Sequence, residues 1–342
     1  AKIPIMDKIA HTNEFHENTF RMIRELVLQN FNHPSIVLWG HACEILGDMD
    51  WYWPRPIDPD EKERHLEQTY KFSVEMENLT RELDPSRLTA NDYHTDPTPE
   101  WYVESYLTDI SPLNGWNIYQ GWYHVNLENT GAMLDTTREY NPDVAHLVAE
   151  TGAGSDTRIH THEPTIFDFS IEYQDLYIRT YLDAVAERSW CTGLCFWTLF
   201  DFQVKHRRDT MPHINNKGVL RADRTPKDGY FLLQAHWSDR PMVHVAAQNW
   251  THRVAFCQPG GTVKVPISLY SNQERVELLL DGQSLGVRAV SNGIATWQVD
   301  FHEGDNRLEA VVEGRPELRD FCTVHFQYFP QDLLEGPFPD TP

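Results

Sequence analysis

The first two thirds of the chain alternate short apolar runs with longer amphipathic stretches. Apolar residues recur at helical spacing over residues 16–31 and 171–188, and residues 60–84 form a long polar stretch rich in Glu and Lys/Arg pairs that ends at Asp84-Pro85. Short runs of strand type lie between these stretches, at residues 3–6, 35–39, 87–90, 114–119, 146–150 and 193–197. Strands that alternate with helices predict a parallel α/β fold, with residues 60–84 as a solvated helix.

The last third of the chain has a different pattern. Short alternating or apolar runs cover residues 263–270, 276–280, 294–299, 307–312 and 323–328. Asp281-Gly282 between two of these runs is a typical hairpin turn. This spacing predicts an all-β sandwich. We therefore expect a domain over residues 1–236, a β-sandwich over 237–330 and a tail over 331–342.

Composition narrows the possible partners. The 342 residues carry 29 Lys and Arg against 51 Asp and Glu, a net charge of −22. So acidic a surface argues against nucleic acid and against anionic membranes, and the sequence has no transmembrane run. The 11 Trp and 14 Tyr could stack on sugar rings, although composition alone favours packing in a core as their explanation. The five cysteines are widely spread without a CxxC pair, so no zinc site is indicated and a pairing of Cys257 with Cys322 stays open.

Two carboxylates stand at predicted strand ends. Glu44 follows the run at residues 35–39, and Glu150 closes the run at 146–150. In a parallel barrel the carboxyl ends of the strands meet at one rim, where catalytic residues gather. Two carboxylates there could share the work of glycoside hydrolysis, one as the proton donor and the other as nucleophile or base. The alternative is that each Glu is a structural salt-bridge partner.

Several motifs resemble one enzyme family. Asn32-His33-Pro34-Ser35 followed by Trp39 and Cys43-Glu44 looks like the acid/base signature of glycoside hydrolase family 2, the β-galactosidase and β-glucuronidase group. Glu150-Thr151-Gly152-Ala153 is similar to its nucleophile motif, with Thr151 in place of the usual Tyr. Further matches in the family's order are Asp84–Thr89, Asn117–Tyr123, Phe196–Phe202, Asn215–Lys227, Trp237–His244 and Val276–Gly286.

The resemblance implies a fold and a set of catalytic roles. The fold is a (β/α)8 TIM barrel that lacks its first strands, followed by an all-β immunoglobulin-like sandwich. Glu44 would be the general acid/base and Glu150 the nucleophile of a retaining double displacement, while Tyr119 would hold Glu150 by a hydrogen bond.

The resemblance also implies substrate-binding residues. Trp197 would be the floor on which the sugar stacks, with barrel core as its alternative, and Asn117 belongs to the same motif as Tyr119. Asn215 and Lys217 would reach the outer edge of the sugar, where in the glucuronidase branch an Asn-x-Lys pair grips a carboxylate. The reaction implies no cofactor, and the histidines show no paired spacing that indicates a metal site.

The chain departs from the family pattern in two places. Cys43 stands where the family usually has Asn, which donates to the sugar 2-hydroxyl, so we expect a modified substrate or a weakened enzyme. Residues 3–6 resemble the third barrel strand, so an N-terminal segment or a longer parent chain is expected to complete the barrel. An open barrel would expose strand edges, which could instead associate in a homo-oligomer.

The function expected from these observations is that of a retaining exo-β-glycosidase that removes terminal β-galactosyl-type residues from a carbohydrate substrate. One alternative is a β-glucuronidase or galacturonidase, favoured by Lys217 and the nearby Lys205, Arg207 and Arg208. Another is a non-catalytic carbohydrate-binding relic, favoured by Cys43 and opposed by the presence of both Glu44 and Glu150. The resemblance favours a bacterial periplasmic or secreted protein.

Overall fold

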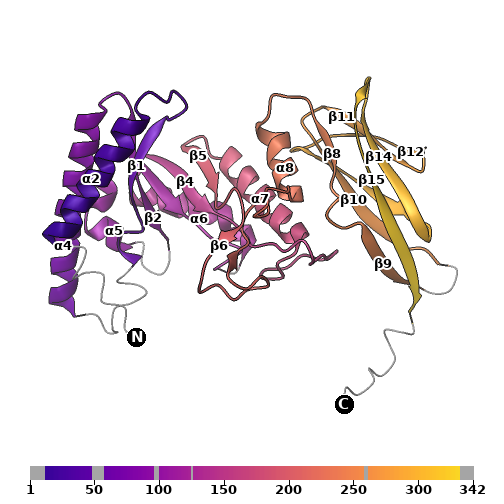
Figure 1. The fold of residues 1–342 in the computed structure, drawn as a ribbon, viewed down its shortest axis with the longest axis horizontal. Coiled ribbons are helices and arrows are strands. Elements are labelled where there is room, and N and C mark those ends of the chain that lie inside the picture. Colours follow the sequence, from indigo (N-terminus) through magenta and orange to yellow (C-terminus); the bar gives the residue numbers. More distant parts are fainter. Residues whose placement is uncertain (1–11, 48–57, 96–99, 125, 258–260, 332–342) are drawn as a thin grey trace, which may run out of the picture. The chain divides into compact units, whose positions relative to one another are not determined.

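The computed structural model describes residues 12–47, 58–95, 100–124, 126–257 and 261–331 (Figure 1). The chain divides into two compact units. The first unit comprises Ala1–Thr151 and Ala184–Phe196, and the second comprises Gly152–Asp183 and Trp197–Pro342. The strand expected at residues 3–6 and the tail from residue 332 onward lie outside the described residues.

A five-stranded parallel sheet forms the first unit. Its strands lie side by side in chain order, and each pairs in parallel with the next. Helices cross over between most of these neighbours, as parallel pairing requires, so the predicted α/β pattern is confirmed. The strands are β1 (Leu38–Cys43), β2 (Leu88–His94), β3 (Leu113–Asn117), β4 (Ala145–Thr151) and β5 (Cys191–Phe196).

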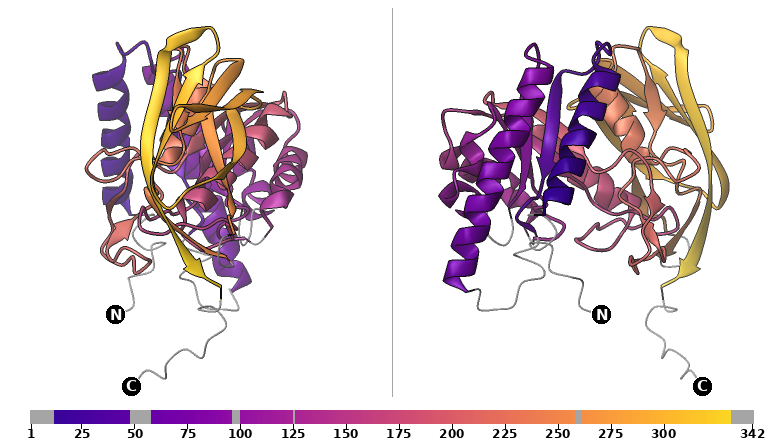
Figure 2. Two further views of the ribbon diagram at one scale, coloured as in Figure 1. Left: turned by 90° about the vertical axis from the view of Figure 1, so that its right-hand side faces the viewer. Right: turned by 60° about the vertical axis from the view of Figure 1, so that its left-hand side comes forward.

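Helices α2 (Asn13–Asn30) and α4 (Pro59–Leu83) lie side by side against this sheet (Figures 1 and 2). The Thr12 hydroxyl caps α2, and the Asp58 carboxylate caps α4 by accepting from two backbone N–H groups. Their shared core contains Trp39, which is 3% exposed. The remaining buried members of that core are Ile23, Val27, Phe72 and Met76.

One face of α4 is not solvated, which corrects the prediction from its polar sequence. Glu77 on this face is 3% exposed and accepts hydrogen bonds from Thr89 Oγ1 at 2.6 Å and Ser111 Oγ at 3.0 Å. Hydrogen bonding to hydroxyl donors offsets the cost of burying the carboxylate, so a polar residue can face the sheet. The shorter helices beside the sheet are α5 (Glu100–Glu104), η1 (Leu107–Asp109), η2 (Leu127–Asn129) and α6 (Thr130–Tyr140).

The second unit contains α7 residues up to Asp183, a small hairpin and a sandwich. Helix α7 covers Ile171–Ala186, β6 (Phe202–Gln203) pairs with β7 (Ile214–Asn215), and α8 covers Asp228–Trp237. The sequence did not predict α8 as a helix, because its apolar residues Phe231-Leu232-Leu233 form a run without clear helical spacing.

The C-terminal region is the expected all-β sandwich. Sheets β13-β10-β8 and β12-β11-β14-β15-β9 face each other over one apolar core that includes Trp297 (Figure 2). The predicted turn is confirmed, because Asp281 and Gly282 both have positive φ, at 49° and 80°. The strands are β8 (Val243–Val245), β9 (His252–Cys257), β10 (Lys264–Ser271), β11 (Arg275–Leu280), β12 (Gln283–Ala289), β13 (Ile294–Asp300), β14 (Gly304–Val312) and β15 (Arg315–Pro330).

Three further features bear on function. All five cysteines are free thiols, so Cys257 and Cys322 do not pair. Across the described ranges, no three His, Cys, Asp or Glu side chains are grouped so that they could hold a metal ion. The helices of those same ranges include none that is both long and apolar enough to cross a membrane.

Candidate active site

The carboxyl ends of four neighbouring strands bring the predicted catalytic residues of the first unit together. In the strand register, Cys43 pairs with Asp92, His94 with Asn117, and Asn117 with Glu150. Glu44 directly follows β1. Because the strands are parallel, all these side chains lie at one edge of the sheet, as Glu44 and Glu150 were predicted to do.

Glu44 is held from three directions. Its backbone N–H donates to the Asp92 carbonyl oxygen at 2.9 Å, and its own carbonyl accepts from Gly47 N at 2.8 Å. Its φ of +50° lies in the left-handed region, which is costly for a residue with a Cβ. Asn117 Nδ2 donates to Glu44 Oε1 at 2.8 Å. These contacts fix both the backbone turn and the carboxylate.

Glu150 is held by Tyr119. The Tyr119 hydroxyl donates to Glu150 Oε1 at 2.5 Å, and the tyrosine is 8% exposed. Burial and the negative charge of Glu150 raise the pKa of Tyr119 far above its usual value, so the phenol keeps its proton and remains a donor. A charge-assisted hydrogen bond of this kind stabilises the ionised form of Glu150.

Cys43 lies beside the same amide as Glu44. Asn117 Nδ2 is 3.7 Å from Cys43 Sγ, a weak contact in which the amide is the donor. Burial, followed by the charge of Glu44, raises the pKa of Cys43 to about 12, so the thiol is neutral at physiological pH. The family usually has an Asn at position 43, and this chain has a thiol there. The amide donor next to Glu44 is therefore that of Asn117.

Asp92 is a functional candidate that the sequence analysis missed. A Cβ added to Gly115 would overlap Asp92 Oδ1, so the carboxylate extends over this glycine on the neighbouring strand. Burial, followed by the charge of Glu44, raises the pKa of Asp92 to about 6. The signal in the sequence is an acidic residue within the otherwise uncharged strand Leu88–His94.

The other three predicted site residues belong to the second unit. Trp197 is 38% exposed in this chain, while Asn215 and Lys217 are 5% and 3% exposed. Lys217 N donates to Asn215 Oδ1 at 3.3 Å, and Thr198 N donates to the Lys217 carbonyl at 3.2 Å. A Cβ on Gly152 would overlap the Trp197 carbonyl oxygen, so only glycine fits there. Trp197, Asn215 and Lys217 thus form one local group.

Comparison with known proteins identifies the family that this chain matches. Residues 2–240 match the family described as "Glycosyl hydrolases family 2, TIM barrel domain", and residues 262–316 match a domain of unknown function, DUF4982. A β-glucuronidase of Bacteroides fragilis is 26% identical over an alignment of 327 positions, and the match covers 92% of this chain and 42% of that protein. The β-galactosidase BoGH2A of Bacteroides ovatus is 22% identical over an alignment of 359 positions, gaps included, and the match covers 93% of this chain and 39% of that protein.

A solved structure leads to the same family. The β-glucuronidase of Bacteroides uniformis superposes with a TM-score of 0.85 at 36% sequence identity, over 94% of this chain and 38% of that one. This chain therefore spans about two fifths of the length of these relatives. The five parallel strands belong to a TIM barrel, and the C-terminal strands form the sandwich that follows it. The chain belongs to glycoside hydrolase family 2, in the group of the β-galactosidases and β-glucuronidases.

Proposed function

We propose that this chain carries the catalytic carboxylates of a retaining β-glycosidase. The observation that supports this most directly is the pair of hydrogen bonds Asn117–Glu44 and Tyr119–Glu150, which orient two carboxylates at one edge of a parallel sheet. Glu44 acts as the acid/base and Glu150 as the nucleophile. A retaining mechanism requires their carboxyl groups ~5–5.5 Å apart.

The proposed reaction has two steps. Glu150 attacks the anomeric carbon while the glycosidic C–O bond breaks and Glu44 gives its proton to the leaving oxygen. A water molecule then attacks the same carbon, Glu44 takes the proton of that water, and the bond to Glu150 breaks. Neither step needs a cofactor. The hydrogen bond from Tyr119 favours Glu150 as the carboxylate that attacks.

The substrate class follows from the second group of residues. A terminal β-glucuronoside is the first candidate, because the Asn215-x-Lys217 pair resembles the pair that grips a sugar carboxylate in the glucuronidase branch, and two of the three relatives described above are β-glucuronidases. A terminal β-galactoside is the second candidate, supported by the β-galactosidase of Bacteroides ovatus. We further propose that a longer parent chain completes the barrel.

Paired substrates test the proposal. The chain, expressed within its complete reading frame, is assayed on the 4-nitrophenyl β-glucuronide and the 4-nitrophenyl β-galactoside, with Glu150→Gln as the matched inactive control. Release of nitrophenol that disappears in Glu150→Gln supports a glycosidase, and the preferred sugar decides between the two candidates. Absence of hydrolysis on a panel of neutral and acidic β-glycosides would refute the enzyme and favour a carbohydrate-binding protein.

A further inference from the structure

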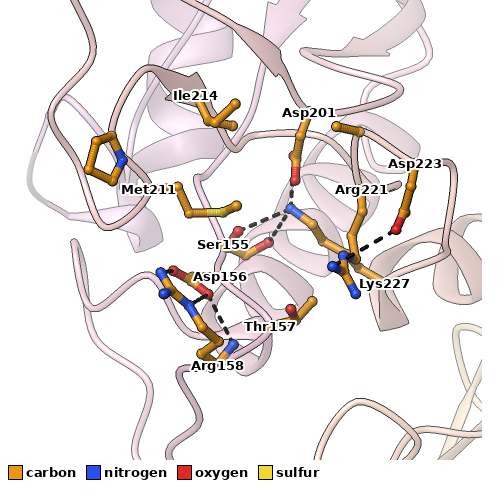
Figure 3. A pocket seen from close by; sticks show the side chains of 12 residues that line it. Ser155, Asp156, Thr157, Arg158, Asp201, Met211, Ile214, Arg221, Asp223 and Lys227 are labelled. Atoms are coloured by element: carbon orange, nitrogen blue, oxygen red, sulfur yellow. Dashed lines mark hydrogen bonds and ion pairs between the residues drawn. The ribbon is translucent and has the colours of Figure 1, made fainter.

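The second unit holds a cavity of about 470 Å³ that none of the predicted site residues lines (Figure 3). Three segments surround it, at residues 155–158, 211–214 and 221–227, together with Asp201. The volume lies within the range of ligand pockets, roughly 300–1,000 Å³. Trp197, Asn215 and Lys217 do not line this cavity, although its lining residue Ile214 directly precedes Asn215.

A buried lysine makes the wall of the cavity rigid. The three N–H donors of Lys227 Nζ are shared among four acceptors at 2.9–3.2 Å, namely the Ser155 carbonyl, Ser155 Oγ, Asp201 Oδ1 and the Asn216 carbonyl. Burial lowers the pKa of Lys227 and raises that of Asp201, and the pairing of the two groups opposes both shifts. Because Lys227 is fully engaged, it holds three chain segments together, and a ligand would bind to other side chains.

The polar groups that remain available are both donors and acceptors. The Arg221 guanidinium makes no hydrogen bond to the described residues, and its nearest carboxylate oxygen, Asp223 Oδ2, is 3.9 Å away. The Thr157 hydroxyl likewise has no hydrogen-bond partner within the described ranges. Arg158 is engaged through Nε and Nη2, which donate to the Asp156 carboxylate. Asp223 Oδ1 accepts from Thr225 N at 3.0 Å, so its Oδ2, the Arg221 guanidinium and the Thr157 hydroxyl are the groups of the lining that a ligand could use (Figure 3).

The opposite wall is apolar. Met211, Pro212 and Ile214 line it, and Figure 3 shows Met211 and Ile214 across the opening from Arg221. An inorganic anion could use the guanidinium but would be repelled by Asp223. A pyranose ring suits every feature, since its hydroxyls both donate and accept while its C–H faces pack on apolar side chains.

We propose that this cavity is an accessory binding site for a single sugar unit of a carbohydrate. Arg221, Asp223 and Thr157 would bind the hydroxyls, and Met211 with Ile214 would contact the apolar face of the ring. The site lies outside the group formed by Trp197, Asn215 and Lys217, so binding there needs no bond cleavage. It goes beyond the proposed hydrolase function and stands or falls separately from it.

Hydrogen–deuterium exchange tests the site directly. The full chain is titrated with methyl β-D-glucopyranosiduronate and methyl β-D-galactopyranoside, in the Glu150→Gln background so that nothing is hydrolysed. We expect at least one sugar to slow exchange in residues 155–158 and 221–227. The substitutions Arg221→Gln and Thr157→Val should each weaken this protection about tenfold. Arg240→Gln removes the same charge from an exposed residue outside the cavity, and it should leave the protection from exchange unchanged.

The outcomes separate the two proposals. Protection of residues 155–158 and 221–227 that is lost in Arg221→Gln supports the accessory site, whether or not the wild-type chain hydrolyses a glycoside. Protection confined to residues 117–123 and 150–152 would overturn it while leaving the glycosidase intact. Protection by inorganic phosphate but by neither sugar would also overturn it, because the ligand would then be an anion.

Discussion

The side-chain amide of Asn117 donates a hydrogen bond to Glu44 Oε1 across the intervening strand β2. The same residue is the register partner of Glu150 on β4. One side chain at the end of β3 therefore lies between the two carboxylates and is hydrogen-bonded to the acid/base candidate. Its Oδ1 is buried and accepts no hydrogen bond from the described residues.

Replacing Asn117 should impair proton donation by Glu44. Asn117→Ala removes one charge-assisted hydrogen bond, worth ~1.5–3 kcal/mol, so we expect kcat/KM to fall about ten- to hundredfold. The loss should be largest for substrates with poor leaving groups, because these depend most on the acid. The measurement is kcat/KM on a series of aryl glycosides with leaving groups of increasing pKa.

Asn114→Ala is the matched control for this variant. Asn114 is on the same strand but donates to the Thr108 carbonyl. Loss of this hydrogen bond should lower the unfolding temperature. Any accompanying decrease in kcat/KM should be the same for all leaving groups. An identical leaving-group profile for the two variants would show that Asn117 acts only through the fold.

Tyr119→Phe should weaken the nucleophile. The substitution keeps the buried ring and removes the hydroxyl that donates to Glu150, so kcat should fall about ten- to hundredfold for all leaving groups alike. Tyr123→Phe is the control, since the two rings lie 4.9 Å apart but Tyr123 is 48% exposed. Equal effects of the two changes would contradict the assigned role of Tyr119.

Truncating the two carboxylates should produce different phenotypes. Glu150→Ala should be inactive on every substrate, because the glycosyl–enzyme bond cannot form. Glu44→Ala should keep activity on aryl glycosides with good leaving groups, and added azide should rescue it to a β-glycosyl azide. Product analysis by NMR distinguishes the cases, and azide rescue of Glu150→Ala instead would exchange the two roles.

The features of the site that the sequence did not predict depend on specific backbone geometry. The apolar runs before Glu44 and Glu150 were sufficient to place both at strand ends. The reach of Asn117 to Glu44 was not predictable, because it depends on the register shift between Gly40 and Ala42 and on the positive φ of Glu44. Hydrophobic periodicity encodes neither feature.

Tertiary packing explains a second limit. The polar sequence of α4 predicts an exposed helix, whereas Glu77 is buried because Thr89 and Ser111 supply hydroxyl donors from strands that are distant in sequence. In the same way, Gly115 makes room for the Asp92 carboxylate only once β2 and β3 are paired. Contacts between residues so distant in sequence could be identified only from the folded structure.

Cys43→Asn tests which sugar binds next to the catalytic carboxylates. If the natural sugar has a free 2-hydroxyl, an amide in place of the weak thiol donor should raise kcat/KM about ten- to hundredfold. If the pocket accepts a sugar that is substituted there, activity on that sugar should fall instead. Assays on unsubstituted and 2-substituted β-glycosides decide between these results. No change on either would mean that Cys43 does not face the 2-position.

Asp92 should make stability depend on pH. Its pKa of about 6 in the folded chain lies above the ordinary value of 3.8, so the folded state binds this proton more tightly than the unfolded state. Its contribution to the free energy of unfolding is therefore complete below about pH 4 and is lost as the pH rises through 6. The difference of about two pH units corresponds to ~3 kcal/mol.

Asp92→Asn should remove this dependence. The amide has nearly the shape of the carboxyl group but does not ionise, so its free energy of unfolding relative to wild type should rise by up to ~3 kcal/mol between pH 4 and pH 7. Urea unfolding at pH 4, 5, 6 and 7 measures the change, with Asp239→Asn at an exposed position as the control. A constant difference across this range would contradict the raised pKa of Asp92 in the folded chain.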